Sequence, residues 1–247
     1  MIKKLFSVLL CAVLCTMPLF GVSAGNGAVR KLTDPAEVMK IVIIERSSNI
    51  PVRIAPVTLE RGGESVDAYL VCMLGVKDNK AQVNKSANLF PAAFNLDNSY
   101  SDFVKKTVLE NIPEGSSLIM AGHSLGGMVA QHLRQDKELI EKYEIINVMT
   151  AGSPLILTKG AVEGTLNRLA DTGDFIPWFS PATIVCPLRQ IREAHRENGG
   201  FNRDPDGAHN ESYLLSSVWG DYDALGAPGG DAVISIDPSA IRNFGVA

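Results

Sequence analysis

The sequence predicts an α/β protein built on a mostly parallel sheet with helices on both of its faces. Two observations lead to this fold class. Short apolar runs of strand length alternate with segments of helical periodicity along much of the chain. Glycine-bearing and polar segments follow the ends of several of those runs, which is where parallel sheets place their functional residues. No linker or repeat divides residues 25–247, which we interpret as one domain.

Residues 1–24 have the pattern of a secretory signal peptide. The chain begins Met1-Ile2-Lys3-Lys4, continues with an apolar stretch to about Val22, and ends this segment with Val22-Ser23-Ala24. A basic start, an apolar middle and small residues before the cleavage point are typical of such peptides. Pro18 interrupts the apolar stretch, which argues against the alternative of a retained membrane anchor. We therefore expect cleavage after Ala24 and a secreted or periplasmic protein.

The net charge bears on which partners the chain can bind, and the cysteines bear on whether it contains a disulfide. The chain has a formal net charge of −4 and no basic run, so we expect no binding to nucleic acid. Two cysteines, Cys72 and Cys186, remain after cleavage. An exporting compartment permits a disulfide between them, but Cys72 lies in an apolar run where a buried free thiol is equally natural. The sequence leaves these two alternatives open.

The first elements of the mature chain are a helix and a hairpin. Asp34 is typical of a helix cap, with Pro35 at the first helical position. Residues 51–59 and 65–74 have strand character, and the glycine-bearing residues 61–64 between them predict a turn. After a polar stretch, the apolar spacing over 99–112 predicts a helix that ends before Pro113.

The next segment carries the main functional motif. Residues 117–121 form an apolar run of strand length, and residues 125–134 have apolar positions on one helical face. Between them, Gly122-His123-Ser124-Leu125-Gly126 matches G-x-S-x-G, the turn that exposes a nucleophilic serine between a strand and a helix. We predict Ser124 as the nucleophile. The oxyanion donors are then the backbone N–H of Leu125 and, from the end of the strand at Gly75, the backbone N–H of Val76.

The remaining elements extend the alternating pattern. Residues 145–150 and 165–170 are predicted strands, residues 211–219 have helical character, and residues 231–237 predict an edge strand. The highly charged residues 189–197 are interpreted as a solvated face. Residues 202–207 resemble the start of a calcium loop, but Tyr213 occupies the position of its last ligand. We interpret them as the turn that delivers His209, and we expect no metal site.

A serine nucleophile requires an imidazole base in hydrogen-bond reach. In folds with this elbow the order along the chain is serine, acid, histidine, which excludes His123 because it precedes Ser124. His132 lies two turns along the predicted helix and points away from the elbow. His195 belongs to the charged run, whereas His209 follows a glycine- and proline-bearing loop at the edge of an element. We therefore favour His209 over His195 as the base.

The base in turn requires a carboxylate that fixes its tautomer. Asp171 and Asp174 compete within one loop that follows a predicted strand. Asp174 precedes Phe175-Ile176-Pro177, an apolar and rigid segment that would hold a carboxylate in a fixed position. Asp171 is equally typical of a turn residue that bonds to its own backbone. We therefore favour Asp174 as the acid.

Taken together, these residues resemble the class 3 lipase family, the fungal-lipase-like branch of the α/β-hydrolases. The matching segments are Gly122 to Gly127, Gly152-Ser153-Pro154 and Asp174 to Pro177, and the resemblance covers roughly residues 50 to 215. It implies an α/β-hydrolase-type sheet, with Ser124 as nucleophile, Asp174 as acid and His209 as base. It implies no cofactor.

The expected function is an exported serine hydrolase that cleaves carboxylic esters, most naturally acyl-lipid esters, through an acyl-enzyme. The expected partners are a small-molecule or lipid ester substrate and, transiently, a lipid surface. Lipase, phospholipase, short-chain esterase and thioesterase would use the same residues, so these alternatives stay open. A catalytically inactive hydrolase-like binding protein is a further alternative. It is favoured by Leu74 and Val76, which replace the arginine and the hydroxyl residue usual in the family.

Overall fold

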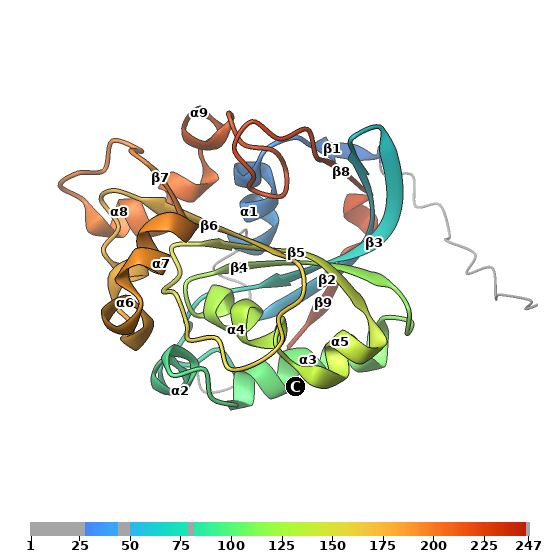
Figure 1. Ribbon diagram of the computed structural model, residues 1–247. Helices are drawn as coiled ribbons and strands as arrows, with labels where there is room; N and C mark the ends of the chain where they lie inside the picture. Colours follow the sequence, from blue (N-terminus) through green and yellow to red (C-terminus); the bar gives the residue numbers. More distant parts are fainter. Residues whose placement is uncertain (1–27, 44–49, 79–81, 246–247) are drawn as a thin grey trace, which may run out of the picture.

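The computed structural model describes residues 28–43, 50–78 and 82–245 and has a mixed α/β architecture (Figure 1). The predicted signal peptide, residues 1–24, lies outside the described residues. The strands are β1 (Arg30–Leu32), β2 (Val52–Arg61), β3 (Glu64–Met73), β4 (Ser117–His123), β5 (Glu144–Ala151), β6 (Thr165–Asp171), β7 (Ala194–Glu197), β8 (Val233–Ile236) and β9 (Arg242–Phe244). They form one nine-stranded sheet in the order β1-β8-β2-β3-β4-β5-β6-β7, with β9 also paired to β2.

The sheet has a parallel part and an antiparallel part. Strands β3 to β7 run parallel to one another. The other pairs are antiparallel: β2 pairs with β3, with β8 and with β9, and β8 also pairs with β1. The α/β class is confirmed, but the antiparallel part is larger than the predicted hairpin. Residues 233–236 were expected at an edge, and this is wrong: β8 lies between β1 and β2. Ile234 and Ile236 are buried there, so both edges and one face of β8 are covered.

Helices cover both faces of the sheet (Figure 1). The α-helices are α1 (Pro35–Ile43), α2 (Leu89–Ala93), α3 (Ser99–Asn111), α4 (Leu125–Leu133), α5 (Lys137–Lys142), α6 (Pro181–Val185), α7 (Pro187–Glu193), α8 (Pro205–Asn210) and α9 (Ser216–Trp219). Short 3-10 helices are η1 (Ser86–Asn88), η2 (Ile176–Trp178), η3 (Ser212–Leu214) and η4 (Pro238–Ala240). Helix α1 packs on one face of the sheet, while α3 and α4 pack on the other.

The alternation of β3 side chains explains the two cores. Leu70 and Cys72 point to the core that contains α1, whereas Val71 and Met73 point to the core that contains α3 and α4. Successive side chains of a strand point to opposite faces, so a strand covered on both sides is apolar throughout its buried length. Cys72 is buried in the first of these cores, and both Cys72 and Cys186 are free thiols.

Several helix boundaries follow the signals read from the sequence. The carboxylate of Asp34 accepts a hydrogen bond from the backbone N–H of Glu37 at 3.0 Å, which confirms it as the cap of α1. Asn98 and Ser101 form a reciprocal capping box at the start of α3. Residues 189–197 were predicted to form a solvated charged face, but the structure places them differently. They end α7 and form β7, which pairs with β6 and places Ala194 in a buried position.

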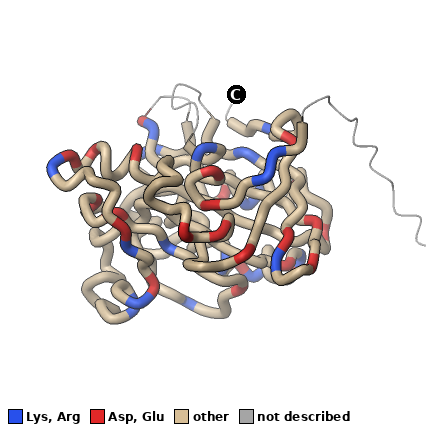
Figure 2. The backbone as a smooth tube through the Cα atoms, turned by 90° about the horizontal axis from the view of Figure 1, so that it is seen from above, with Lys and Arg blue, Asp and Glu red and all other residues tan. Residues whose placement is uncertain are grey.

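Charged residues are distributed throughout the described part of the chain, with basic and acidic positions interspersed (Figure 2). Within the described ranges, the structure contains no helix that is long and apolar enough to cross a membrane.

Helix α4 approaches β3 and β4 so closely that only glycine fits at the contact. A Cβ atom on Gly126 would overlap the carbonyl oxygen of Met73 at the end of β3. A Cβ atom on Gly122 would lie 2.5 Å from the carbonyl carbon of Gly126, and one on Gly127 would lie 2.6 Å from the Cβ of Ser153. At Gly122 and Gly126 the backbones therefore touch without intervening side chains, while Gly127 leaves room for the side chain of Ser153, and the start of α4 has a fixed position relative to the sheet.

We expect Gly126→Ala to lower the free energy of unfolding by about 3 kcal/mol or more, because the added methyl group meets backbone that cannot move aside. The matched control is Gly160→Ala. A Cβ there has no described heavy atom within 4 Å beyond its chain neighbours, so we expect a change within about 0.5 kcal/mol. Urea unfolding followed by circular dichroism measures both variants. Equal stabilities of the two would contradict the close contact.

Candidate active site

Ser124 occupies a sharp turn between β4 and α4. Its backbone has φ 53° and ψ −122°, which are the angles of the first central residue of a type II′ turn. A positive φ is strained for a residue with a side chain and costs about 1–3 kcal/mol. The backbone N–H of Ser124 donates to the carbonyl of Ala151 on β5 at 2.9 Å, and this bond holds the turn in place. The predicted strand, turn and helix are thus all present.

The structure brings the three residues predicted as a triad into one hydrogen-bonded chain. Nε2 of His209 lies 3.1 Å from Oγ of Ser124, and Nδ1 of His209 lies 2.8 Å from Oδ2 of Asp174. An ionised carboxylate only accepts hydrogen bonds, so the proton of a neutral His209 ring belongs on Nδ1. Nε2 then faces the serine hydroxyl with its lone pair. This is the arrangement in which an imidazole can remove the hydroxyl proton.

The carboxylate of Asp174 is fully enclosed and saturated with donors. Oδ1 accepts from the backbone N–H of Ile176 at 2.9 Å, while Oδ2 accepts from the hydroxyl of Tyr213 at 2.9 Å in addition to the His209 ring. A buried carboxylate is tolerated only where such partners replace water. Burial, together with the adjacent Asp174 carboxylate, raises the pKa of Tyr213 well above its usual value. Tyr213 therefore remains a neutral donor.

Tyr213 also joins the two competing aspartates. Its hydroxyl accepts a hydrogen bond from the backbone N–H of Asp171 at 2.9 Å while it donates to Asp174. The side chain of Asp171 does not reach the histidine. It accepts from the N–H groups of Gly173 and Gly199 at 2.7 Å and from the hydroxyl of Ser212, so it is a loop-fixing residue, as the sequence indicated.

The other three histidines lie outside the triad. His195 is on β7 beside Asn167, and burial lowers its pKa. His132 lies towards the far end of α4, where it contacts Asn95 and Asp97. His123 lies next to the site: its Nε2 is 2.7 Å from the backbone carbonyl of His209. Since a carbonyl only accepts, Nε2 of His123 must carry a proton, and this bond helps to anchor the residue that bears the base.

His209 was expected on a loop, and this detail is wrong, because it lies in the short helix α8. Asp204 caps this helix by accepting from the N–H of Gly207 at 3.0 Å, and Pro205 occupies its first position. Asp204 thus serves the turn that carries His209. Among the described residues, no group of three His, Cys, Asp or Glu side chains is placed to hold a metal ion.

The loop after β3 lies against Ser124. A Cβ atom on Gly75 would lie 3.0 Å from the Cβ of Ser124 and 3.2 Å from the carbonyl oxygen of His123, so glycine permits this approach. The buried side chain of Asn84 donates from Nδ2 to the carbonyl of Gly75 at 2.6 Å. The backbone N–H of Lys77 donates to the carbonyl of Asn84 at 2.8 Å. This segment therefore fixes the orientation of the Gly75–Val76 peptide.

A cavity of about 350 Å³ opens beside Ser124. Its lining consists of residues from the loop after β3, from α1, from the elbow and from α8: Ile43, Leu74, Gly75, Val76, Lys77, His123, Ser124, His209 and Asn210. The predicted nucleophile, base and second oxyanion residue therefore share one cavity. Both apolar and polar residues line this cavity, as is usual in sites that bind an organic molecule or part of one.

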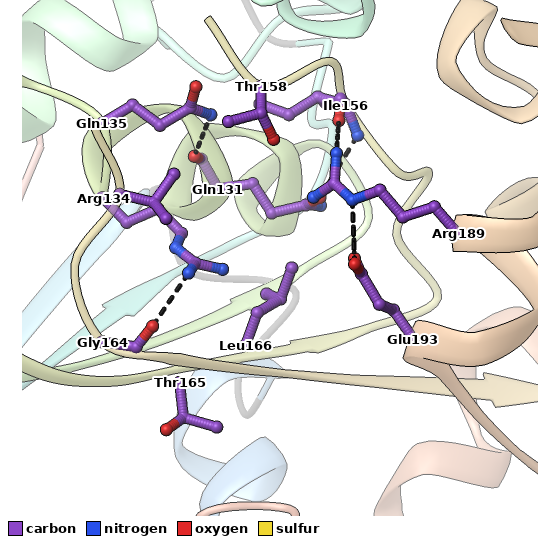
Figure 3. A pocket seen from close by; sticks show the side chains of 11 residues that line it. Gln131, Arg134, Gln135, Ile156, Thr158, Gly164, Thr165, Leu166, Arg189 and Glu193 are labelled. Atoms are coloured by element: carbon purple, nitrogen blue, oxygen red, sulfur yellow. Dashed lines mark hydrogen bonds and ion pairs between the residues drawn. The ribbon is translucent and has the colours of Figure 1, made fainter. Parts of the chain in front are cut away.

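A larger hollow of about 420 Å³ lies at the opposite end of α4 (Figure 3). Its charged side chains point to partners within the protein rather than into the space. Arg189 pairs with Glu193 at 2.9 Å, and Arg134 donates to the carbonyl of Gly164 at 2.8 Å. Ser124 and His209 do not line it. The smaller cavity is therefore the one that contains the predicted catalytic residues.

Three contributions to the site were not predicted from the sequence: the Tyr213 hydroxyl on Asp174, the His123 bond to the carbonyl of His209, and the Asn84 amide on Gly75. Each joins residues that are distant in the chain or whose side chain direction depends on the fold. Comparison of the chain with protein-family models, curated proteins and solved structures gives no match.

We expect Tyr213→Phe to lower the free energy of unfolding by about 1–3 kcal/mol at neutral pH, because it leaves the buried N–H of Asp171 without its acceptor. Because folding raises the pKa of Tyr213, its contribution is present below the ordinary tyrosine value of about 10 and is lost as the pH rises above it. Urea unfolding at several pH values measures both effects.

Tyr69→Phe on β3 is the matched control, because the Tyr69 hydroxyl has no hydrogen-bond partner among the described residues. If the two variants lost equal stability, the hydroxyl of Tyr213 would not have the structural role described above.

Proposed function

We propose that this chain is a serine hydrolase that cleaves carboxylic esters through an acyl-enzyme, with Ser124 as nucleophile, His209 as base and Asp174 as acid. The observation that carries the proposal is the continuous chain of hydrogen bonds from Ser124 through His209 to Asp174. Each member has the chemical partner that the reaction requires, and the chain starts in a strained turn that exposes the hydroxyl to a cavity. No cofactor takes part in this mechanism.

In the first half of the proposed reaction, Nε2 of His209 accepts the hydroxyl proton as Oγ of Ser124 attacks the ester carbonyl. The imidazole becomes positively charged, and the buried carboxylate of Asp174 stabilises that charge at 2.8 Å. The same proton then passes to the leaving alcohol, which departs as the acyl-enzyme forms. In the second half, water takes the place of the alcohol and the steps run in reverse order, which releases the acid.

The negative oxygen of the tetrahedral intermediate requires fixed N–H donors. Leu125 is the first residue of α4, so its N–H has no acceptor one turn back in that helix. Val76 supplies the second donor in this proposal. In a trans peptide the C=O and N–H bonds point in opposite directions. Asn84 holds the carbonyl of Gly75 on one side, and we infer that the N–H of Val76 consequently faces the cavity.

The lining of the cavity favours an apolar acyl group as the substrate part next to the reacting carbon. Ile43, Leu74 and Val76 contribute apolar surface, and Lys77 lies at the same cavity. An acyl-lipid ester combines an apolar chain with a polar head, which suits such a lining. We also propose that the chain is exported from the cytoplasm and that residues 1–24 are removed as its signal peptide.

We expect a fluorophosphonate probe to label the folded protein at one site, and we expect Ser124→Ala to abolish that labelling. The matched control is Ser153→Ala, another buried serine that follows a neighbouring strand. Gel fluorescence and mass spectrometry of the labelled peptide identify the site. Absence of labelling in folded wild-type protein, or labelling that persists in Ser124→Ala, would contradict the hydrolase and favour the inactive binding protein.

Turnover of p-nitrophenyl esters separates the two histidines that the sequence left in competition. We expect His209→Ala to lower kcat by at least about a thousandfold, because it removes the base. His195→Ala is the control, since His195 lies on β7 next to Asn167 of β6 and does not line the cavity at Ser124. A loss confined to His195→Ala would contradict the assignment. A series of acyl-chain lengths then distinguishes short-chain esterase from lipid-directed activity.

We expect Asn84→Ala to lower kcat by about tenfold or more with little change in KM, because the Gly75–Val76 peptide loses its fixed orientation while ground-state contacts remain. Asn147→Ala is a matched control. Asn147 is also buried and donates to a backbone carbonyl at 3.1 Å, that of Leu225, and neither residue lines the cavity at Ser124. Equal losses of kcat in the two variants would show that Asn84 acts only through stability.

A further inference from the structure

The segment from Phe175 to Ile191, which forms η2, α6 and most of α7, has an exposed apolar surface that we call the α6–α7 face. It consists of Phe175, Phe179, Ile184, Val185, Leu188 and Ile191, which are 50%, 65%, 84%, 67%, 81% and 62% exposed. Single exposed apolar side chains are common on soluble proteins, but a contiguous segment with six of them indicates a surface that is covered in use.

The orientation of this segment is fixed by polar contacts on its inner side. Gln190 is completely buried and donates from Nε2 to the carbonyl of Pro177 at 2.9 Å. Arg189 is half-buried, where it pairs with Glu193 and donates to the carbonyl of Ile156 at 3.3 Å (Figure 3). An amphipathic helix of a soluble domain ordinarily turns its apolar side inward. Helix α7 does the reverse, so the exposure of Leu188 and Ile191 is part of the fold.

The α6–α7 face begins at Phe175, which directly follows Asp174, the acid of the proposed active site. The rings of Phe175 and Phe179 pack edge to face, with their centroids 5.6 Å apart. Helices α6 and α7 lie at the same end of the sheet as α8, which carries His209 (Figure 1). A surface that covers the face would therefore lie at the end of the sheet where α8 holds His209.

The charge around the face differs from that of the rest of the chain. Residues 175–192, which contain the face, include two arginines and no acidic residue, although the whole chain has a net charge of −4. Arg192 is 81% exposed, with Glu193 3.9 Å away, and the exposed Arg196 lies over the ring of Trp178 in η2. Arginine side chains bind phosphate groups through charge-assisted, bidentate hydrogen bonds. The partner that fits this charge is anionic.

We propose that the α6–α7 face docks the protein onto an anionic lipid surface, with the apolar side chains among the acyl chains and the arginines against phosphate head groups. A fluid lipid layer accommodates protruding side chains such as Ile184 and Leu188 without a preformed hollow. A second copy of this chain would instead bring two arginine-bearing surfaces together. The choice of a lipid surface rests on the proposed function, because acyl-lipid esters are presented there.

The test is vesicle co-sedimentation of the full mature chain in the Ser124→Ala background, which prevents hydrolysis of the lipid. The vesicles contain equal parts of phosphatidylcholine and phosphatidylglycerol. We expect binding to fall at least about tenfold when Ile184, Leu188 and Ile191 are all changed to serine. We expect Arg192→Gln to weaken binding about fivefold, and added salt or pure phosphatidylcholine vesicles to weaken it further.

The matched control changes Val29, Val66 and Val162 to serine, three exposed apolar residues outside the face. We expect this variant to bind vesicles as the parent does. Circular dichroism checks that the variants are folded, and turnover of soluble p-nitrophenyl esters, measured with Ser124 restored, should be unchanged in both triple variants.

Failure of vesicle binding by the parent protein, or equal binding by the two triple variants, would overturn the docking proposal. Lipid-independent dimerisation that only the Ile184, Leu188 and Ile191 variant loses would show that a second copy covers the face. These results are independent of the hydrolase proposal. Fluorophosphonate labelling without vesicle binding leaves the hydrolase standing alone, whereas vesicle binding without labelling leaves only the docking surface.

Discussion

The contact between the start of α4 and the ends of β3 and β4 fixes the side of the site that bears Ser124. At Gly122 and Gly126 the backbones meet with no side chain between them, so the helix cannot shift along the sheet. Ser124 lies inside this contact, and its positive φ follows from the abrupt change of direction between strand and helix. The same contact places the end of β3, and with it Gly75, against Ser124. One packing constraint therefore positions the hydroxyl, one side of the cavity and the loop that bears the second proposed oxyanion donor.

The opposite side of the site depends on a buried charge. Asp174 has its oxygens occupied by His209, Tyr213 and the N–H of Ile176. In a low-dielectric interior each of these bonds matters, since an unpaired carboxylate would be strongly disfavoured. Because Tyr213 also holds the backbone of Asp171, the loop after β6 and the segment after α8 are locked together. The position of the base is thus set by a network, which is anchored again by His123 at the carbonyl of His209.

Local signals in the sequence were enough to identify the elbow, its strand and its helix, because an apolar run, glycines and a helical face lie next to one another. The cap at Asp34 was found in the same way. Asp204-Pro205 is the same type of signal before α8, and it could have placed His209 in a helix. The position of β8 between β1 and β2 could not be found, since alternating Val233, Ile234 and Ile236 fit an edge or an inner strand equally well. β7 was not predicted because most of its residues are charged or polar. It lies at the edge of the sheet, and an edge strand needs few apolar side chains.

The triad was predicted by chain order, whereas its supporting residues depend on contacts between distant segments. Tyr213 lies 39 positions from Asp174, and no sequence pattern states that its hydroxyl turns towards a carboxylate. The structure adds a physical argument that chain order alone lacks. A strained serine, a fully buried carboxylate and an outward-facing apolar surface each lower the stability of the folded state, and all three occur at one end of the sheet. Proteins retain departures from locally favourable structure mainly where function requires them. Their coincidence around Ser124 is therefore the feature of this end of the sheet that the proposed reaction and the proposed docking surface together would account for.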